Sequence, residues 1–302
     1  MKAVVYERYG PPDVLQLKDI EKPKPKDNEI LIKVYSTTVT AGDWRMRKAE
    51  PFIVRFFSGL FRPKRVKILG FELAGVVEDV GVKVKSFKKG DAVFASCGFK
   101  FGGYAEYRCL PENNVIALKP SNMTFDQAAA VPIGGLTAIR LLRQAGAKSG
   151  DNVLVYGASG SVGTFAVQLA KYFGANVTAV CSSANLDLVR SLGAELAIDY
   201  TKDDFTKVDK RFDIIFDAVA KTSKSKFTPL LKPGGKFVTV GSSPKSNPDD
   251  LLKLKEIIEG GHLKSVIDRK YRLEQIREAH AYVDQFRKKG NVIITVFEVK
   301  KS

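Results

Sequence analysis

Short apolar runs with high strand propensity fill the first 120 residues of the chain. They read AVVY from residue 3, ILIKVYSTTV from residue 30, ELAGVVEDVG from residue 72 and DAVFAS from residue 91. Clusters of Gly, Pro, Asp and Lys separate these runs, and such clusters favour turns. The pattern predicts a compact β barrel or sandwich over residues 1–120.

The pattern changes near residue 121, where Ala- and Leu-rich sequence begins. Residues 122–146 predict two helical stretches interrupted around Pro132 and the glycines Gly134 and Gly135. Strand-like and helix-like runs then alternate, which is typical of an α/β domain with a parallel sheet and right-handed crossovers. The expected strands cover residues 152–157, 176–182, 195–200, 212–219 and 234–241, and the expected helices cover 161–174 and 184–194.

The end of the chain returns to a strand-like pattern. Residues 262–271 and 291–299 predict two strands on either side of an amphipathic helix over residues 272–290. We expect these strands to rejoin the first domain. The domains are therefore expected to be a β-rich one, made by residues 1–120 and completed by 262–302, and an α/β one over residues 121–261.

A turn of small residues, GASGSVG from Gly157 to Gly163, joins a predicted strand to a predicted helix. Phosphate oxygens reach the N–H groups at a helix N-terminus only where side chains are small, and the helix dipole favours their charge. Ala158 stands where the pattern G-x-G-x-x-G has its first glycine. The strand, turn and helix context nevertheless favours dinucleotide binding over a simple tight turn. The expected phosphate-binding residues are Ala158, Ser159, Gly160, Ser161, Val162 and Gly163.

The next predicted strand ends at Ser182, which Ser183 follows. A site that prefers NAD usually places Asp or Glu here, against the ribose hydroxyls. Residues 180–185 contain no carboxylate, so a 2′-phosphate would meet no like charge, and both serine hydroxyls could donate to it. This favours NADP over NAD, although the serines could simply cap the following helix.

The charge of the chain is strongly positive. Its 302 residues include 49 Lys and Arg against 33 Asp and Glu, which gives a net charge of +16, while 44% hydrophobic and 27% charged residues are typical of a soluble globular protein. Such a surplus attracts polyanions. The basic residues are spread along the chain without a helix-turn-helix, zinc-finger or base-stacking signature, so nucleic acid is not the expected partner.

The sequence shows no signal peptide, no membrane-spanning run and no metal-binding motif. No apolar run approaches the roughly 20 residues that span a bilayer, and the start lacks the features of a signal peptide, so we expect a cytoplasmic protein without a membrane span. The soft metal ligands lie far apart and show no metal-binding spacing. They are Cys97, Cys109, Cys181, His262 and His280.

The motifs together resemble those of the zinc-independent branch of the medium-chain dehydrogenase/reductase superfamily, the quinone oxidoreductase-like proteins. The resemblance spans nearly the whole chain and rests on GPPDVLQL, VTAGDWRMR, GFELAGVVEDVG, GGYAEY, AAAVPIGGLTAI, GASGSVG, RSLGAELAIDY, LKPGGKFVTVG and HLKSVIDRKYRLEQIREAH. It implies a GroES-like catalytic domain and a Rossmann-type cofactor domain. Phe71 replaces the histidine of the zinc-dependent branch, so no zinc is expected.

The resemblance also implies site residues. Thr40 matches a position that lines the nicotinamide pocket, although it could be satisfied internally. The cofactor-contacting positions are Thr137, Tyr200, Val240, Gly241, Ser242 and Asn291. Thr137 could likewise be satisfied internally, and Tyr200 could be a core aromatic. Relatives have lysine at Asn291, so a phosphate contact is expected to be missing there. Asp43 and Tyr104 are candidate proton donors, but Asp43 could cap a turn and Tyr104 could pack the barrel.

These observations lead to one functional hypothesis with two alternatives. The chain is expected to be an NADPH-dependent reductase that transfers hydride to quinones or α,β-unsaturated carbonyls without a metal. The alternatives are a zinc-free NAD(P)-dependent alcohol or aldehyde reductase, and a basic nucleic-acid-binding or structural protein on this scaffold. Residues 242–250, SSPKSNPDD, stand where relatives have a sixth Rossmann strand used in dimers. We therefore expect that strand to be missing and a monomer to be slightly favoured.

Overall fold

The computed structural model describes residues 1–242 and 247–298, and they form two compact units. Unit 1 comprises residues 1–133 and 267–302, and unit 2 comprises residues 134–266. The first boundary lies 13 residues beyond the expected one, because helix α3 (Phe125–Ala129) packs against the sheet of unit 1. Its Asp126 accepts a hydrogen bond from Ser36 at 2.5 Å and pairs with Lys270 at 2.6 Å.

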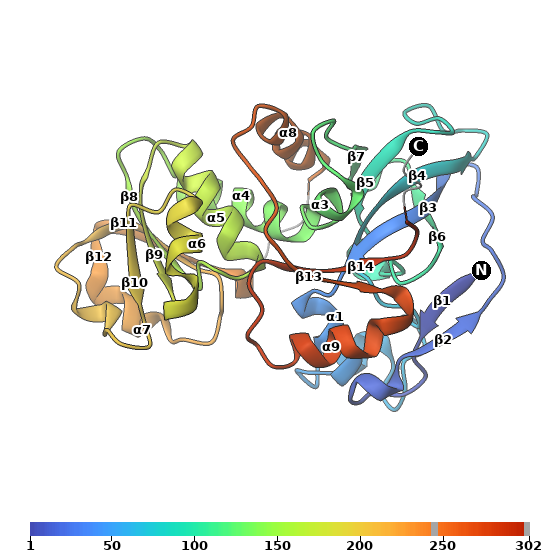
Figure 1. The fold of residues 1–302 in the computed structure, drawn as a ribbon, viewed down its shortest axis with the longest axis horizontal. Coiled ribbons are helices and arrows are strands. Elements are labelled where there is room, and N and C mark those ends of the chain that lie inside the picture. The colour runs from blue at the N-terminus through green and yellow to red at the C-terminus, as the bar shows by residue number, and fades with distance from the viewer. Residues whose placement is uncertain (243–246, 299–302) are drawn as a thin grey trace. The chain divides into compact units, whose positions relative to one another are not determined.

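Unit 1 is built on a seven-stranded sheet, and five of its strands follow runs predicted from the sequence (Figure 1). The order is β13-β14-β3-β4-β5-β7, with β6 also paired to β3. Strand β14 pairs antiparallel with β3, which places the end of the chain beside its beginning. The bounds are β3 (Glu29–Thr38), β4 (Glu72–Val80), β5 (Ala92–Ser96), β6 (Tyr107–Pro111), β7 (Ile116–Leu118), β13 (Ile267–Arg272) and β14 (Asn291–Thr295); β1 (Lys2–Val5) and β2 (Gln16–Asp19) form a separate pair.

Two helices of unit 1 interrupt the predicted all-β pattern. Helix α1 (Ala41–Lys48) begins with a capping box, in which Thr40 and Asp43 bond each other's backbone N–H groups. A threonine followed three residues later by an acid is a local helix start. Helix α2 (Val54–Ser58) follows it, and α9 (Ile276–Val283) is the amphipathic helix predicted in the tail.

Unit 2 contains the expected parallel sheet, in the order β10-β9-β8-β11-β12 (Figure 1). This order reverses between β8 and β11, which is the topological switch point of a Rossmann fold. The described residues contribute five strands to it, and part of the segment expected to replace a sixth strand, residues 243–246, lies outside them. The strands are β8 (Asn152–Tyr156), β9 (Asn176–Cys181), β10 (Leu196–Asp199), β11 (Phe212–Asp217) and β12 (Leu231–Thr239).

The helices of unit 2 mostly follow the predicted alternation. They are α4 (Pro132–Ala145), α5 (Ser161–Tyr172), α6 (Leu186–Ser191), α7 (Lys224–Phe227) and α8 (Pro248–Glu259). The predicted break at Gly134 and Gly135 is wrong, because both lie inside α4 and Pro132 begins that helix, where its missing N–H costs nothing. Among the described residues, no helix is both long and apolar enough to cross a membrane.

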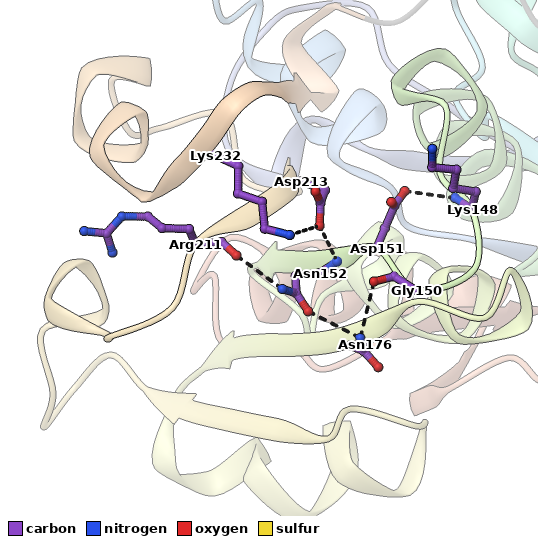
Figure 2. Close-up of polar contacts among 8 residues, drawn as sticks. All are labelled: Lys148, Gly150, Asp151, Asn152, Asn176, Arg211, Asp213 and Lys232. Carbon is purple, nitrogen blue, oxygen red and sulfur yellow. Dashed lines mark hydrogen bonds and ion pairs between the residues drawn. The ribbon is translucent and has the colours of Figure 1, made fainter.

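A polar network holds together the ends at which the strands of unit 2 begin (Figure 2). Asp213 accepts hydrogen bonds from the Asn152 N–H at 2.8 Å and from Lys232 Nζ at 2.7 Å. The Asn176 side chain donates to Asn152 at 3.3 Å and to the Gly150 carbonyl at 3.4 Å. The hydrogen-bonding groups of these side chains are paired with one another at this edge of the sheet. Ligands of open parallel sheets bind at the opposite edge, where the strands end.

Candidate functional site

The turn between β8 and α5 forms an open helix N-terminus. Gly160 is the N-cap of α5 and no side chain caps it, so the first N–H groups of the helix have no intrahelical partner. Gly157 has a φ of +75°, and the N–H groups of Gly157 and Ala158 both donate to the Val180 carbonyl at 3.1 Å. A Cβ at Gly163 would lie 2.1 Å from the Gly157 oxygen, which explains this glycine as a close contact of turn and helix.

Helix α4 lies against the beginning of α5. A Cβ at Gly134 would come within 2.8 Å of the Phe165 ring and 3.1 Å of Ser161 Oγ. Thr137 lies one turn further along α4 and is partly exposed. The glycine in α4 therefore allows the close contact of this helix with the beginning of α5.

Ser182 belongs to the same edge as the turn. The Asn185 side chain donates to Ser159 Oγ and to Ser182 Oγ, at 3.2 Å in each case. Asn185 thus links the residue after β9 to the turn after β8, and Ser182 keeps partial exposure. No side-chain hydrogen bond makes Ser182 a helix cap, so the capping alternative is wrong for this residue.

Ser183 contacts a carboxylate that the sequence analysis missed. Its hydroxyl donates to Asp199 Oδ2, at the end of β10, and lies 3.1 Å from Thr201 Oγ1. Asp199 also accepts from the Thr201 N–H at 3.0 Å and the Thr201 hydroxyl at 2.6 Å. These bonds, that of Ser183 above all, lower the pKa of Asp199. The expectation of an edge without a carboxylate is therefore incomplete, because the adjacent strand supplies one.

Tyr200 and the end of β12 complete this edge of unit 2. Tyr200 is 53% exposed, so it is not a core aromatic, and its N–H donates to the Cys181 carbonyl at 3.1 Å. Val240, Gly241 and Ser242 form a 3-10 turn directly after β12. Asp217, at the end of β11, accepts from the Thr239 hydroxyl at 3.1 Å and braces that strand end.

In unit 1, the three predicted catalytic residues differ in exposure. Asp43 is completely buried and accepts from the Thr40 N–H at 2.8 Å, the Thr40 hydroxyl at 2.7 Å and the Gly70 N–H at 2.8 Å. Burial raises its pKa to about 6. Tyr104 is also completely buried, with its hydroxyl 3.1 Å from His280 Nε2. Both hold together the protein interior in this conformation, and Thr40 keeps partial exposure.

Two further ionisable groups of unit 1 escaped the sequence analysis. Glu72 is completely buried, accepts from Thr38 at 2.5 Å and from the Ile133 N–H at 2.6 Å, and burial raises its pKa to about 8. Burial also shifts the pKa of Lys288, which it lowers to about 8. The negative charge of Glu72 partly opposes this shift. Lys288 lies three residues before Asn291, which is buried at the start of β14. Lys288 therefore places a cation close in sequence to Asn291, where a phosphate contact is expected to be missing.

The position expected to lack a zinc ligand is filled by aromatic packing. The Phe71 ring lies 4.2 Å from the Phe101 ring and 5.9 Å from the Phe99 ring, and a Cβ at Gly42 would come within 2.4 Å of it. Within residues 1–242 and 247–298, no three His, Cys, Asp or Glu side chains converge on a common point.

Known proteins match the chain over nearly all its length. Residues 26–120 match the alcohol dehydrogenase GroES-like domain, and residues 161–279 match the zinc-binding dehydrogenase family. The 2-methylene-furan-3-one reductase of Solanum lycopersicum and the chloroplastic NADPH-dependent alkenal/one oxidoreductase of Arabidopsis thaliana are each 36% identical over 97% of this chain and 79% of the relative. The structure of the quinone oxidoreductase from Coxiella burnetii has a TM-score of 0.86 and 28% identity, covering 98% of this chain and 99% of that chain.

Proposed function

Because the chain belongs to the medium-chain dehydrogenase/reductase superfamily, as a quinone oxidoreductase-like member, we propose that it reduces quinones or α,β-unsaturated carbonyls with NADPH. The match to the alkenal/one oxidoreductase over 97% of the chain is the observation that carries the proposal. The aromatic packing of Phe71 supports a site that works without zinc.

A nicotinamide cofactor fits the residues of unit 2. Its diphosphate would lie at the N-terminus of α5, beside the small residues of the turn from Ala158 to Gly163. Thr137 would contact it from α4, and Tyr200 would border the adenosine end. Val240, Gly241 and Ser242 would lie beside the nicotinamide. When bound, the reduced cofactor supplies the hydride.

We propose NADPH rather than NADH as the preferred cofactor. Ser182 is partly exposed and its hydroxyl can donate to a 2′-phosphate. Asp199 opposes this preference, since it holds the Ser183 hydroxyl and carries a negative charge nearby. The named cofactor of the relative from Arabidopsis thaliana supports NADPH. The preference is therefore expected to be moderate.

The residues of unit 1 position a substrate rather than activate it. Thr40 is the partly exposed member of the capping box, and the buried Asp43 accepts a hydrogen bond from its hydroxyl. A quinone or enone needs no metal, because conjugation spreads the charge that develops on its oxygen. Tyr104 supports the same region through His280. Solvent supplies the proton in this proposal, so no buried acid has to reach the substrate.

We place the protein in the cytoplasm. Cys97, Cys109 and Cys181 are all free thiols, which suits a reducing compartment. Fractionation of the source cells with an antibody against the chain would test this. Recovery of the chain in an organelle, the compartment printed in the names of some relatives, would overturn it.

Turnover with a substrate panel tests the reaction. The kcat/KM values for a naphthoquinone, an enone and a saturated aldehyde would be compared with NADPH and with NADH, before and after treatment with a zinc chelator. We expect the quinone or the enone to be the best substrate with NADPH, with no loss on chelation. Turnover confined to the aldehyde, or activity lost to the chelator and restored by zinc, would contradict the proposal. Salt-sensitive binding of a polynucleotide without any turnover would favour the nucleic-acid alternative.

A further inference from the structure

Large apolar side chains crowd the surface of one short segment of unit 1. Six side chains between residues 52 and 61 are 44% to 86% exposed, and Phe61 is the most exposed of them. Single exposed apolar residues are ordinary, but a contiguous group marks an interaction surface. The six are Phe52, Ile53, Phe56, Phe57, Leu60 and Phe61, and we call them the aromatic patch.

The backbone beneath the aromatic patch is firmly anchored. The Ser58 carbonyl accepts from the N–H groups of Lys64 at 2.8 Å and Arg65 at 3.1 Å, and Ser58 is completely buried. Tyr9 donates to the Gly59 carbonyl at 2.7 Å, and the Arg55 guanidinium lies 5.0 Å from the centre of the Tyr9 ring. The aromatic rings are therefore presented outward by a fixed turn around α2.

A basic rim follows the aromatic patch directly in sequence. It consists of the exposed residues Arg62, Lys64, Arg65 and Lys67. Three of them, with Pro63 and Glu7, line a pocket of about 400 Å³. Glu7 already pairs with Lys18 at 2.9 Å. In the described part of the chain, no ion pair within 4 Å uses Arg62, Lys64 or Lys67. The pocket therefore has an excess of positive charge, with three cations against the single carboxylate of Glu7.

We propose that the aromatic patch and the basic rim bind the surface of a membrane that contains anionic phospholipids. The rings of Phe56, Phe57 and Phe61 would enter the boundary between headgroups and acyl chains, and the rim would bind lipid phosphates. The net charge of +16 adds long-range attraction to such a surface. The proposal does not depend on the reaction that the protein catalyses.

Other occupants fit this surface less well. A second copy of the chain, docked patch to patch, would bring two basic rims together, and like charges would oppose it. A nucleic acid would engage the rim and its bases could stack on the phenylalanines, but the aliphatic side chains of Ile53 and Leu60 would gain no apolar partner. An anionic lipid surface complements the apolar side chains and the cations together.

Vesicle sedimentation tests the proposal with the full chain. Vesicles of phosphatidylcholine with and without phosphatidylglycerol would be mixed with the protein at about 0.1 M salt, where charges act over about 10 Å. We expect binding to the vesicles with phosphatidylglycerol and little to those without. The triple change R62Q/K64Q/K67Q should weaken binding about 100-fold, because each basic residue contributes about fivefold. The triple change F56S/F57S/F61S should also weaken it strongly.

Matched variants separate this surface from general charge. Lys85, Lys88 and Lys89 are exposed in another loop of unit 1, so K85Q/K88Q/K89Q removes the same charge elsewhere and should change binding less than threefold. Circular dichroism would confirm that every variant is folded. The proposal is overturned if the chain does not bind vesicles with phosphatidylglycerol, or if R62Q/K64Q/K67Q and K85Q/K88Q/K89Q lose binding equally. It is also overturned if F56S/F57S/F61S only dissociates a dimer of the chain.

Discussion

Asp199 places a negative charge where a cofactor phosphate is expected, and it takes up the hydroxyl of Ser183. The sequence alone shows Ser182 and Ser183 at a strand end. It does not show that Asp199, 16 residues after Ser183, accepts a hydrogen bond from the Ser183 hydroxyl. That contact depends on the parallel pairing of β9 with β10, which sets Asp199 opposite Cys181.

The charge of Asp199 should therefore limit the preference for NADPH. In Asp199→Asn the amide oxygen can still accept from Thr201, the amide NH2 can donate to the Ser183 hydroxyl in place of the bond now accepted from it, and the charge is removed. We expect the affinity for NADPH to rise about fivefold, which corresponds to about 1 kcal/mol, with little change for NADH. Titration calorimetry with both cofactors would measure this.

Two further variants serve as comparisons for the cofactor titration of Asp199→Asn. Ser182→Asp should act in the opposite direction, since it adds a charge that repels the 2′-phosphate and accepts from ribose hydroxyls. Asp204→Asn removes an exposed acid of unit 2 that caps a turn through Thr206, and should leave the NADPH to NADH ratio unchanged. An equal gain for both cofactors in Asp199→Asn would show that its charge does not face the 2′-position.

Glu72 should make the stability of the protein depend on pH. Burial raises its folded-state pKa from 4.5 to about 8, so the folded chain keeps a proton that the unfolded chain releases. The free energy of unfolding therefore falls as pH rises through this window, by up to about 1.4 kcal/mol per pH unit. Glu72→Gln does not titrate, and we expect its Tm to fall less than that of the wild type between about pH 6 and about pH 8.

The choice of this range isolates Glu72 from its neighbours. Asp43 has a folded-state pKa of about 6, so most of its contribution is lost below the range. Lys288, with a pKa lowered from 10.5 to about 8, contributes mainly above it. Parallel Tm curves for the wild type and Glu72→Gln over this range would mean that Glu72 is ionised in the folded protein.

Elements were predictable from the sequence where their pattern is local. The strands β3, β4, β5, β8, β9 and β11 follow apolar runs, and α5 follows the small-residue turn. Helix α1 was not predicted, although Thr40 and Asp43 form a capping box. The strand-like pattern around this short motif covers many more residues than the motif itself. The sequence pattern predicts a helix break at Gly134, whereas the small size of this glycine allows α4 to pack closely against Phe165. That contact is tertiary and leaves no mark on local sequence.

The beginning of α5 offers a test at the scale of one element. In Gly163→Ala the new Cβ would lie 2.1 Å from the Gly157 carbonyl oxygen, so the turn and the helix must separate. We expect a loss of about 1 to 3 kcal/mol in stability, together with weaker cofactor binding. Thermal unfolding and a cofactor titration would measure the two effects.

Gly160→Ala is the matched control for that change. Its Cβ would lie 3.4 Å from the nearest atom, and the φ of −77° suits alanine, so its Tm should stay near that of the wild type. If Gly160 faces the diphosphate, as proposed, cofactor binding should still weaken, because a methyl group then stands where phosphate approaches. Equal Tm values for the two variants would contradict the close contact assigned to Gly163.

On the scale of the whole molecule, the overall charge and the two-unit plan were readable from the sequence, and the boundaries were less so. The first unit extends to residue 133 because Asp126 ties α3 to Ser36 and Lys270, which lie 90 residues before it and 144 residues after it. The aromatic patch could not be predicted from the sequence either. An apolar run is typical of a protein core, and only the fold shows that Phe61 is exposed.

The edge of the sheet in unit 2 leads to an expectation about assembly. Strand β12 pairs with β11 on one side, and among the described residues no strand pairs with its other side. Pro233 cannot donate to a further strand, Gly234 and Gly235 weaken strand pairing, and Lys232 and Lys236 place charges along the same strand. Such an edge disfavours pairing with a second copy, and a net charge of +16 opposes close association at low salt.

We therefore expect a monomer of 33.2 kDa in solution. Light scattering at low and at physiological salt would measure the mass, with F56S/F57S/F61S as a comparison that removes the aromatic patch. The replacement P233V should shift the protein toward a dimer if the edge is what prevents pairing, because valine restores a donor N–H and favours strands. A wild-type dimer with a sheet continuous through β12 would show that the charged and proline-containing edge does not block self-association.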